Sequence, residues 1–258
     1  MTNLSSVKST KPVNSIELLI RVKRCMWCLP AGLILLLMGL MIQSALAAYA
    51  DVQVHQAERI ERRWVSGSTQ FNKADYDRAQ AHLNQGLSLN SDNADFHQMS
   101  GRLAGWVLAD SFSSETYDKA VAHFEASISA RPYWPYAYSD FSGIIALKLS
   151  LKSHQKGNDD LELILNSYWD NALKYGGNEP LVVQSLLNIG FGNWHVSGWK
   201  LKNKTIALFQ ASLESNSMMQ REAINLARYY QFTQVLCQFY RLEGEVPRPM
   251  IRECHKYN

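Results

Sequence analysis

The sequence predicts an all-α protein, with helical hairpins stacked in a row behind one N-terminal transmembrane helix. Three observations support this fold class. Residues 25–50 contain no charged side chain, which suits them to a membrane. Apolar residues in the rest of the chain recur with the 3.6-residue period of amphipathic helices, and no stretch shows the strict alternation of a half-buried strand. Similar helix pairs also follow one another between residues 71 and 218.

The first two elements are a basic cytoplasmic tail, residues 1–24, and an apolar segment, residues 25–48. A helix needs about 20 apolar residues to cross the roughly 30 Å hydrocarbon core of a bilayer, and the segment meets this length. A cleaved signal peptide is the alternative, because Ala45-Leu46-Ala47 is a small-residue cleavage site. We favour the retained transmembrane helix, because a 24-residue lead is long for a signal peptide.

Charge on the N-terminal side of the apolar segment predicts its orientation. Arg21, Lys23 and Arg24 precede the segment, and such basic residues keep their side of a membrane helix in the cytoplasm. The chain after residue 50 is therefore expected outside the cytoplasm in either alternative. Cys25 and Cys28 form a C-x-x-C pair without the strand–helix pattern of a thioredoxin-like site, so we interpret them as membrane-embedded thiols.

Residues 49–70 are predicted to form a juxtamembrane helix. Its centre is the charged run Glu58-Arg59-Ile60-Glu61-Arg62-Arg63, which we interpret as a solvated, self-paired helix face in which Glu58 and Arg62 lie four positions apart. The closeness of this run to the apolar segment also suits contact with lipid headgroups or with a partner protein.

Four segments between residues 71 and 218 repeat one pattern. In each, a bulky residue is followed three positions later by a small one, which places both on one helix face and lets a neighbouring helix approach. The bulky and small residues are Leu83 and Gly86, Phe124 and Ser127, Trp169 and Ala172, and Phe209 and Ser212. The helices before them share a second pattern, found at residues 96–103 and 138–145 and, more loosely, at residues 183–190.

These patterns resemble the tetratricopeptide repeat (TPR), a helical hairpin that stacks into an α-solenoid. Ala120, Phe124 and Ser127 occupy the slots that the second helix of that repeat fills with alanine, a bulky residue and a small residue. The resemblance implies a TPR-like repeat domain over residues 71–245. Successive copies are 41, 45 and 40 residues apart, where the family has 34, so the hairpins are expected to carry insertions.

The last predicted element is a C-terminal tail, residues 246–258, which follows the helix-ending Gly244 and Pro247. Cys237 and Cys254 lie on either side of this turn, 17 positions apart. Outside the cytoplasm they would meet an oxidising compartment, so a disulfide and two free thiols are both open alternatives. A disulfide closing a loop of this length would stabilise the fold by about 3 kcal/mol.

Composition and the absence of motifs argue against several function classes. The 258-residue chain has 26 Lys and Arg against 23 Asp and Glu, and residues 51–258 alone have a net charge of −1. That is not the basic footprint of a nucleic-acid-binding protein. No nucleophile elbow, phosphate-binding loop, zinc-ligand pair or dinucleotide fingerprint occurs. We therefore predict that the protein is not an enzyme, with no catalytic residue, cofactor, metal or nucleic-acid partner.

The repeat resemblance supplies a candidate binding surface. In that family the first helix of each hairpin lines a groove that holds a partner segment. Carried over slot by slot, the groove-lining positions are His97, Tyr136, Ser139, Gln184 and Asn188. These side chains are polar or amphipathic, as the resemblance implies for a groove that binds a peptide or a glycan.

Aromatic residues extend the candidate surface. Such rings stack on sugars, but they also fill the gaps between helices. Trp134 stands beside Pro135 and is expected to be partly exposed, and Trp194 with His195 forms a second candidate pair. Trp106 and Trp169, in contrast, lie on apolar faces and are expected in the core.

The order of the elements resembles the VpsP-type family of bacterial exopolysaccharide biosynthesis clusters, because a basic lead, one apolar segment and a small exported repeat domain follow one another. The resemblance implies a single-pass protein of the bacterial inner membrane with its C-terminal domain in the periplasm. It also implies an accessory role in making, assembling or exporting a surface polysaccharide, with protein partners from that envelope system and a glycan as a further ligand.

We therefore expect a membrane-anchored periplasmic scaffold for exopolysaccharide biosynthesis and biofilm formation, acting by protein–protein binding. Two alternatives stay open. One is an envelope enzyme or enzyme subunit acting on lipid-linked sugars, which would need a catalytic site spread over distant residues. The other is a soluble periplasmic carrier or chaperone, which would need cleavage after Ala47.

Overall fold

The computed structural model describes residues 15–151 and 158–257, with the backbone alone for residues 15–29, 158 and 257. Within these ranges the chain forms eleven α-helices, one short 3₁₀ helix and no β-strand, which confirms the predicted all-α class. The chain divides into two compact units, Met1–Asp51 and Val52–Asn258, which we describe separately.

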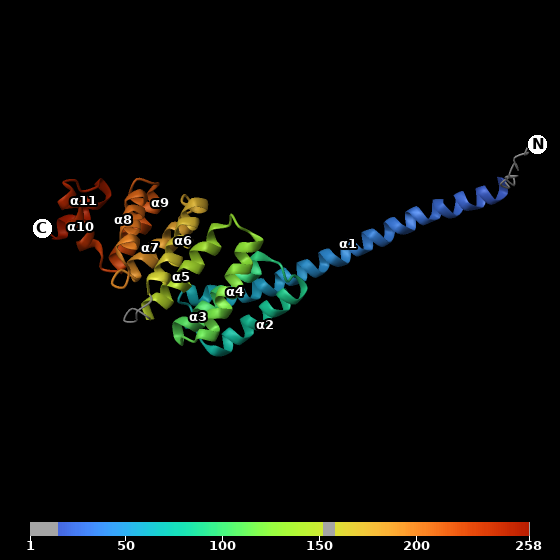
Figure 1. The fold of residues 1–258 in the computed structure, drawn as a ribbon, viewed down its shortest axis with the longest axis horizontal. Helices are drawn as coiled ribbons and strands as arrows, with labels where there is room; N and C mark the ends of the chain where they lie inside the picture. Colours follow the sequence, from blue (N-terminus) through green and yellow to red (C-terminus); the bar gives the residue numbers. More distant parts are fainter. Residues whose placement is uncertain (1–14, 152–157, 258) are drawn as a thin grey trace, which may run out of the picture. The chain divides into compact units, whose positions relative to one another are not determined.

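The first unit contains most of α1 (Ser15–Val65), a single helix of 51 residues (Figure 1). All side chains from residue 30 to residue 49 are exposed, and the most apolar window of the helix has a mean hydropathy of 2.1. This helix is therefore long and apolar enough to cross a membrane. Residues 1–14 of the predicted tail, and the side chains of Cys25 and Cys28, lie outside the described part of the chain.

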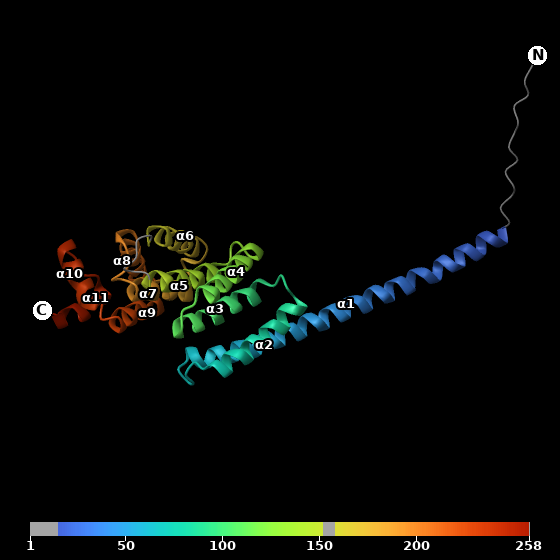
Figure 2. The same ribbon diagram turned by 60° about the horizontal axis from the view of Figure 1, so that its bottom comes forward.

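The second unit begins within α1 and continues through short connections between its helices. Among the described residues its helices pack pairwise, α3 against α4 and α5 against α6, while α3, α5, α7 and α9 each contact the next of that series (Figures 1 and 2). Their bounds are α2 (Lys73–Leu89), α3 (Ala94–Asp110), α4 (Ser114–Ala130), α5 (Pro135–Leu151), α6 (Asn158–Gly176), α7 (Pro180–Gly192), α8 (Trp199–Leu213), α9 (Ser217–Tyr229), α10 (Thr233–Glu243) and α11 (Arg248–Cys254).

Polar caps and turn residues determine where these helices begin and end. The Asn72 side chain accepts a hydrogen bond from the backbone N–H of Asp75 at 2.9 Å, and Ser113 accepts one from Thr116 at 3.1 Å. Each bond satisfies a first-turn donor that has no partner within its helix. Gly244 ends α10 with a φ of +88°, a left-handed conformation that glycine adopts without a Cβ clash.

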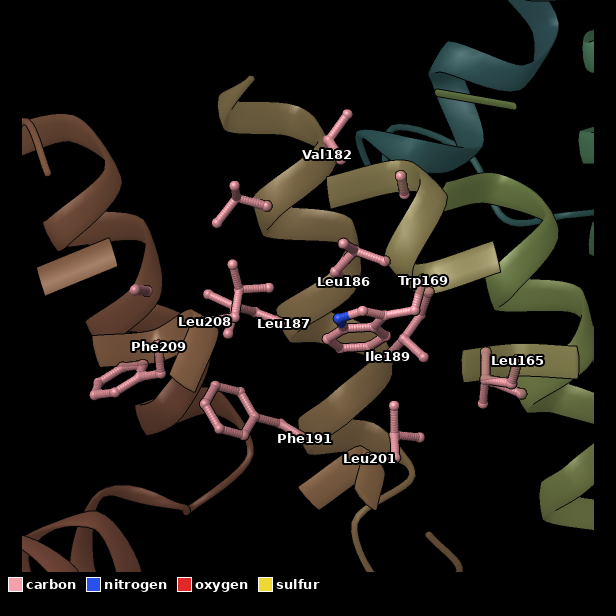
Figure 3. Packing of buried hydrophobic residues seen from close by; sticks show 14 of the residues in the cluster. Leu165, Trp169, Val182, Leu186, Leu187, Ile189, Phe191, Leu201, Leu208 and Phe209 are labelled. Carbon is pink, nitrogen blue, oxygen red and sulfur yellow. The ribbon is translucent and has the colours of Figure 1, made fainter. Parts of the chain in front are cut away.

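The repeated positions form the centre of the second unit. All four bulky residues of the predicted pattern are fully buried, and so are the four small residues three positions later. Figure 3 shows the third of them, Trp169 of α6, beside Leu186 and Leu187 of α7 and Leu201 of α8. The helix faces assigned from this pattern are therefore the faces that pack.

A close approach between α3 and α4 depends on glycine. A Cβ atom at Gly101 would lie 2.6 Å from the ring of Phe124, the bulky residue of α4. Gly143 holds the equivalent position in α5, but the nearest atom to a Cβ there would be 3.9 Å away. Only the first of these two equivalent glycines is therefore required by packing.

The folded unit starts earlier than the predicted boundary at residue 71. The last part of α1 buries Ala57, Ile60, Glu61 and Trp64, which have the same spacing as Phe96, Met99, Ser100 and Leu103 of α3. This part of α1 therefore packs within the second unit, where Gln53 is hydrogen-bonded to His82 of α2 and Glu61 pairs with Arg102 of α3. The compact unit accordingly begins at Val52.

The C-terminal residues also belong to the folded unit. Residues 248–254 of the predicted tail form α11, in which Met250 and Cys254 are buried. Cys254 forms a disulfide with Cys237 of α10, with their Cα atoms 5.3 Å apart, so the structure takes the bonded alternative. Nearby, Glu253 accepts hydrogen bonds from Arg228 of α9 at 2.5 and 3.1 Å.

Candidate functional site

Two adjoining cavities form a groove across the first helices of successive pairs. They measure about 530 and 450 Å³ and are lined by side chains from the last part of α1 and from α3, α5 and α7. Both cavities are lined by Arg102, Ser139, Asp140 and Ser185, so these residues form the floor of one continuous depression. We refer to this depression as the groove.

A chain of hydrogen bonds and ion pairs runs along the groove. The indole N–H of Trp134 donates to Gln98 Oε1 at 3.0 Å, and Gln98 Nε2 donates to Asp140 Oδ2 at 2.7 Å. Arg102 lies 4.0 Å from Asp140 and donates to both carboxylate oxygens of Glu61, at 3.0 and 2.5 Å. These hydrogen bonds and ion pairs link α1, α3 and α5 and fix the polar side chains before any ligand binds.

Burial determines the electrostatics of the groove floor. The Glu61 side chain is only 3% exposed, and burial raises the pKa of its carboxyl although Arg102 opposes this effect. Burial likewise raises the pKa of Asp140, against the guanidinium of Arg102 and the hydrogen bond from Gln98. Both carboxyl groups therefore depend on Arg102 to hold their charge.

Carboxylates outnumber cations in the groove. Glu58 and Asp95 line it together with Glu61 and Asp140, and Arg102 is the one cation among the lining residues of the two cavities. The two outer carboxylates are paired at the edges, Glu58 with Arg62 at 2.8 Å and Asp95 with Arg131 at 2.7 Å. The groove consequently favours a ligand that brings positive charge or hydrogen-bond donors.

Aromatic rings lie at both ends of the groove. Trp134 and Tyr136 contact each other with ring centroids 4.9 Å apart, and Tyr136 donates to Glu179 at 3.0 Å. At the other end Trp106 lies with its ring parallel to that of Phe71 and its N–H directed to Glu61 at 3.4 Å. Trp106 is half-buried and lines the groove, so the prediction that places it in the core is wrong, whereas Trp169 is fully buried as predicted.

The structure brings four of the eight predicted surface residues into the groove. These are Trp134, Tyr136, Ser139 and Asn188, although the Ser139 side chain is 1% exposed and donates to the backbone of Tyr136. Asn188 accepts a hydrogen bond from Tyr230 at 2.6 Å, which fixes its amide.

The other four predicted residues lie elsewhere. Neither cavity of the groove includes His97 or Gln184 in its lining, and the His97 ring contacts His123 of α4, with 3.1 Å between their Nδ1 atoms. Trp194 is half-buried against Phe232, with ring centroids 4.5 Å apart, and the adjacent His195 is exposed. Trp194 and His195 therefore do not extend the groove.

The groove residues that sequence analysis missed share one register. Gln98, Asp140 and Ser185 each stand two positions after the first residue of the predicted first-helix pattern, whereas His97, Ser139 and Gln184 stand one position after it. One residue turns a helix by about 100°, so the lining face lies toward these residues, although Ser139 also lines both cavities. The recurrence of polar residues at these three positions was the signal available in the sequence.

The groove is suited to binding an extended ligand, because it combines fixed carboxylates, amides and exposed aromatic edges along one surface. Among the described residues, no three His, Cys, Asp or Glu side chains are grouped as ligands for a metal ion. No protein-family model matches the chain, and neither the curated proteins nor the solved structures contain a significant match to it.

Proposed function

We propose that the protein is a membrane-tethered binding module, whose groove holds an extended segment of a partner protein close to the membrane. The observation that carries this proposal is the groove, which side chains from four successive first helices line without interruption. Its hydrogen-bonded network is formed in advance, so a ligand would not bear the entropic cost of ordering these side chains.

The arrangement of helix pairs proposed here is a TPR-like solenoid. Its support is the burial of the repeated positions and the contacts of α3 with α5, α5 with α7 and α7 with α9. In such a stack the first helices form one side and the second helices the other, which makes an elongated surface from short local repeats.

The partner segment proposed for the groove carries basic residues flanked by apolar ones. Lysine or arginine would pair with the carboxylates that exceed the single guanidinium of Arg102 among the lining residues. Apolar side chains would cover the edges of Trp134 and Trp106. An extended chain rises about 3.3 Å per residue, so several of its residues would contact successive helices.

We assign the partner to an envelope system that makes or exports a surface polysaccharide, with α1 crossing the inner membrane and the second unit in the periplasm. The support for this context is the order of the elements, which resembles that of VpsP-type proteins. The disulfide between Cys237 and Cys254 is in keeping with an oxidising compartment. A glycan is the further ligand, because Trp134 and Tyr136 offer ring faces beside carboxylate and amide groups.

The test is deletion of the gene in its host, with complementation by variants of the full chain and quantification of cell-surface polysaccharide. Trp134→Ala removes a ring of the groove, and Trp199→Ala is its matched control, because Trp199 is 75% exposed and does not line the groove. We expect wild type and Trp199→Ala to restore the polysaccharide, and Trp134→Ala to leave it at least several-fold lower at equal protein level.

Three results would count against the proposal. Unchanged polysaccharide after deletion would remove the polysaccharide context. Equal rescue by Trp134→Ala and Trp199→Ala would mean that the groove is not needed for the function. Full rescue by residues 52–258 alone, exported behind a cleavable signal peptide, would remove the need for the tether.

A further inference from the structure

A further cavity, separate from the two that form the groove, lies between α1 and α2 on another face of α1. It measures about 490 Å³, more than ten times the roughly 30 Å³ of liquid that one water molecule occupies. Four of its seven lining residues are arginines and a fifth is a histidine, and none is acidic. They are Gln56, Arg59, Ile60, Arg62, Arg63, Arg78 and His82. We refer to it as the arginine cavity.

The folding of α1 separates charges that are mixed in the sequence. Glu58 and Glu61 are three positions apart and line the groove, where Arg102 pairs with Glu61. Arg59 and Arg63 are four positions apart and line the arginine cavity. One face of the helix is thus acidic and the next is basic, although the six-residue run itself has a net charge of only +1.

The arginine cavity is incompletely neutralised by the protein. Arg62 is paired with Glu58 at 2.8 Å, and Arg78 is paired with Asp75. Among the described residues, no carboxylate lies within 4.0 Å of Arg59 or Arg63, while Arg78 stands across the cavity from them on α2. Asp75, the partner of Arg78, also attracts Arg63 from a greater distance, so one carboxylate compensates in part the guanidinium groups that face this water-accessible space.

We propose that the arginine cavity binds a phosphate group. Guanidinium groups donate paired hydrogen bonds in a planar fork that matches phosphate oxygens, and Arg59, Arg63 and Arg78 line one cavity with no acidic residue in its lining. The proposal concerns a different face of α1 from the groove, and it does not depend on the function proposed for the groove.

The cavity is close to the membrane segment along the chain. Arg59 lies nine positions after Ala50, the last residue of the uncharged run. Even a fully extended chain of nine residues spans no more than about 30 Å. Phosphate carried by an anionic lipid headgroup and phosphate in solution are therefore both candidate sources of the group, because juxtamembrane basic residues are attracted to anionic membranes when they lie within about a Debye length of the surface.

The test uses the full chain purified in a neutral detergent. Native mass spectrometry would measure retention of short-chain phosphatidylglycerol, with phosphatidylcholine as the zwitterionic comparison, and ³¹P NMR line broadening would measure binding of inorganic phosphate. The variant Arg59→Gln with Arg63→Gln removes the two unpaired guanidinium groups. Its matched control is Arg221→Gln with Arg252→Gln, an equal loss of charge at exposed residues outside this cavity.

We expect at least tenfold weaker binding of the phosphate ligand in the Arg59/Arg63 variant and unchanged binding in the control. A second variant, Arg59→Lys with Arg63→Lys, keeps the charge without the planar fork and should bind with intermediate affinity. Retention of phosphatidylglycerol alone would identify the lipid headgroup as the source, and displacement of it by inorganic phosphate would identify a phosphate in solution. Equal loss in the glutamine variant and its control, or no binding to wild type, would overturn the proposal.

Discussion

The ion pair at the groove floor makes a quantitative prediction. Replacing Arg102 with methionine leaves the Glu61 carboxylate buried, with the indole N–H of Trp106 at 3.4 Å as its remaining hydrogen-bond donor. Breaking a buried ion pair by removing one partner typically costs 3–5 kcal/mol, because an uncompensated charge remains. Arg102→Met should therefore destabilise the fold strongly at neutral pH.

Protonation limits that cost and gives it a pH signature. The carboxyl of Glu61 has an ordinary pKa of 4.5, so holding it neutral at pH 7 costs about 3.4 kcal/mol, at 1.36 kcal/mol per unit. At pH 5 the same neutralisation costs about 0.7 kcal/mol. Burial raises the pKa of the Glu61 carboxyl in the folded state above its ordinary value. The contribution of this group to the free energy of unfolding is therefore most favourable below pH 4.5 and is lost as pH rises.

The assay is urea unfolding of the full chain in neutral detergent, followed by helical circular dichroism at pH 5 and pH 7. We expect Arg102→Met to lower the free energy of unfolding by about 3 kcal/mol at pH 7 and by less than about 1 kcal/mol at pH 5. Adding Glu61→Gln should recover part of the loss at pH 7 and weaken its pH dependence, while Asp140, whose charge Arg102 also stabilises, keeps the remainder. Equal losses at both pH values, or a double variant no more stable than the single one, would refute the assignment of Glu61 as a charge held by Arg102.

Three further predictions concern the packing and the C-terminal helices. Gly101→Ala should destabilise by about 1–3 kcal/mol in urea unfolding, because its Cβ would lie 2.6 Å from Phe124, whereas Gly143→Ala should stabilise by up to about 1 kcal/mol through helix propensity. A reducing agent should lower wild-type stability by about 3 kcal/mol in thermal melting and leave Cys237→Ser unaffected; an equal response of both would contradict a stabilising disulfide. Arg228 and Lys256 lower the pKa of Glu253 to about 2, so the stability that this carboxylate contributes is present above pH 4.5 and lost as pH falls toward 2; Glu253→Gln should flatten the thermal stability profile between pH 2 and 5, and an unchanged profile would contradict the pairing.

The core positions could be predicted from the sequence because they depend on local periodicity. A bulky residue such as Phe124 and a small residue such as Ser127 share one helix face wherever that helix lies, and burial follows once any neighbour covers the face. The end of α10 was predictable for the same reason, since Gly244 ends the helix by its own backbone conformation.

The groove was only partly predictable, because its lining depends on how neighbouring helices are rotated. A rotation of up to about 100° adds Asp140 beside Ser139 and brings Ser185 in place of Gln184 on the lined face, and no local pattern determines that angle. The role of Glu61 was hidden because its partner, Arg102, lies 41 residues away. In sequence, Glu61 belongs to the charged run that we interpreted as a solvated, self-paired helix face.

The predicted boundary of the folded unit at residue 71 was placed too late, because the apolar segment and the first packed segment belong to one helix, α1. The apolar part of α1 and its last turns follow one another without a break, so the pattern at Ala57, Ile60 and Trp64 was hidden behind the membrane signal. The partners of the disulfide, in contrast, could be named from the sequence, because Cys237 and Cys254 are the two cysteines after residue 50.

Photocrosslinking in living cells tests the central claim, that the groove binds a partner segment, most directly. A photoreactive phenylalanine analogue would replace Leu181, which lines the groove and is 61% exposed, or Leu163, which is equally exposed at 62% on α6 and does not line it. We predict a discrete protein adduct from position 181 that disappears with Trp134→Ala, and none from position 163. No adduct from position 181, or the same adducts from both positions, would contradict the assignment of the groove as the binding site.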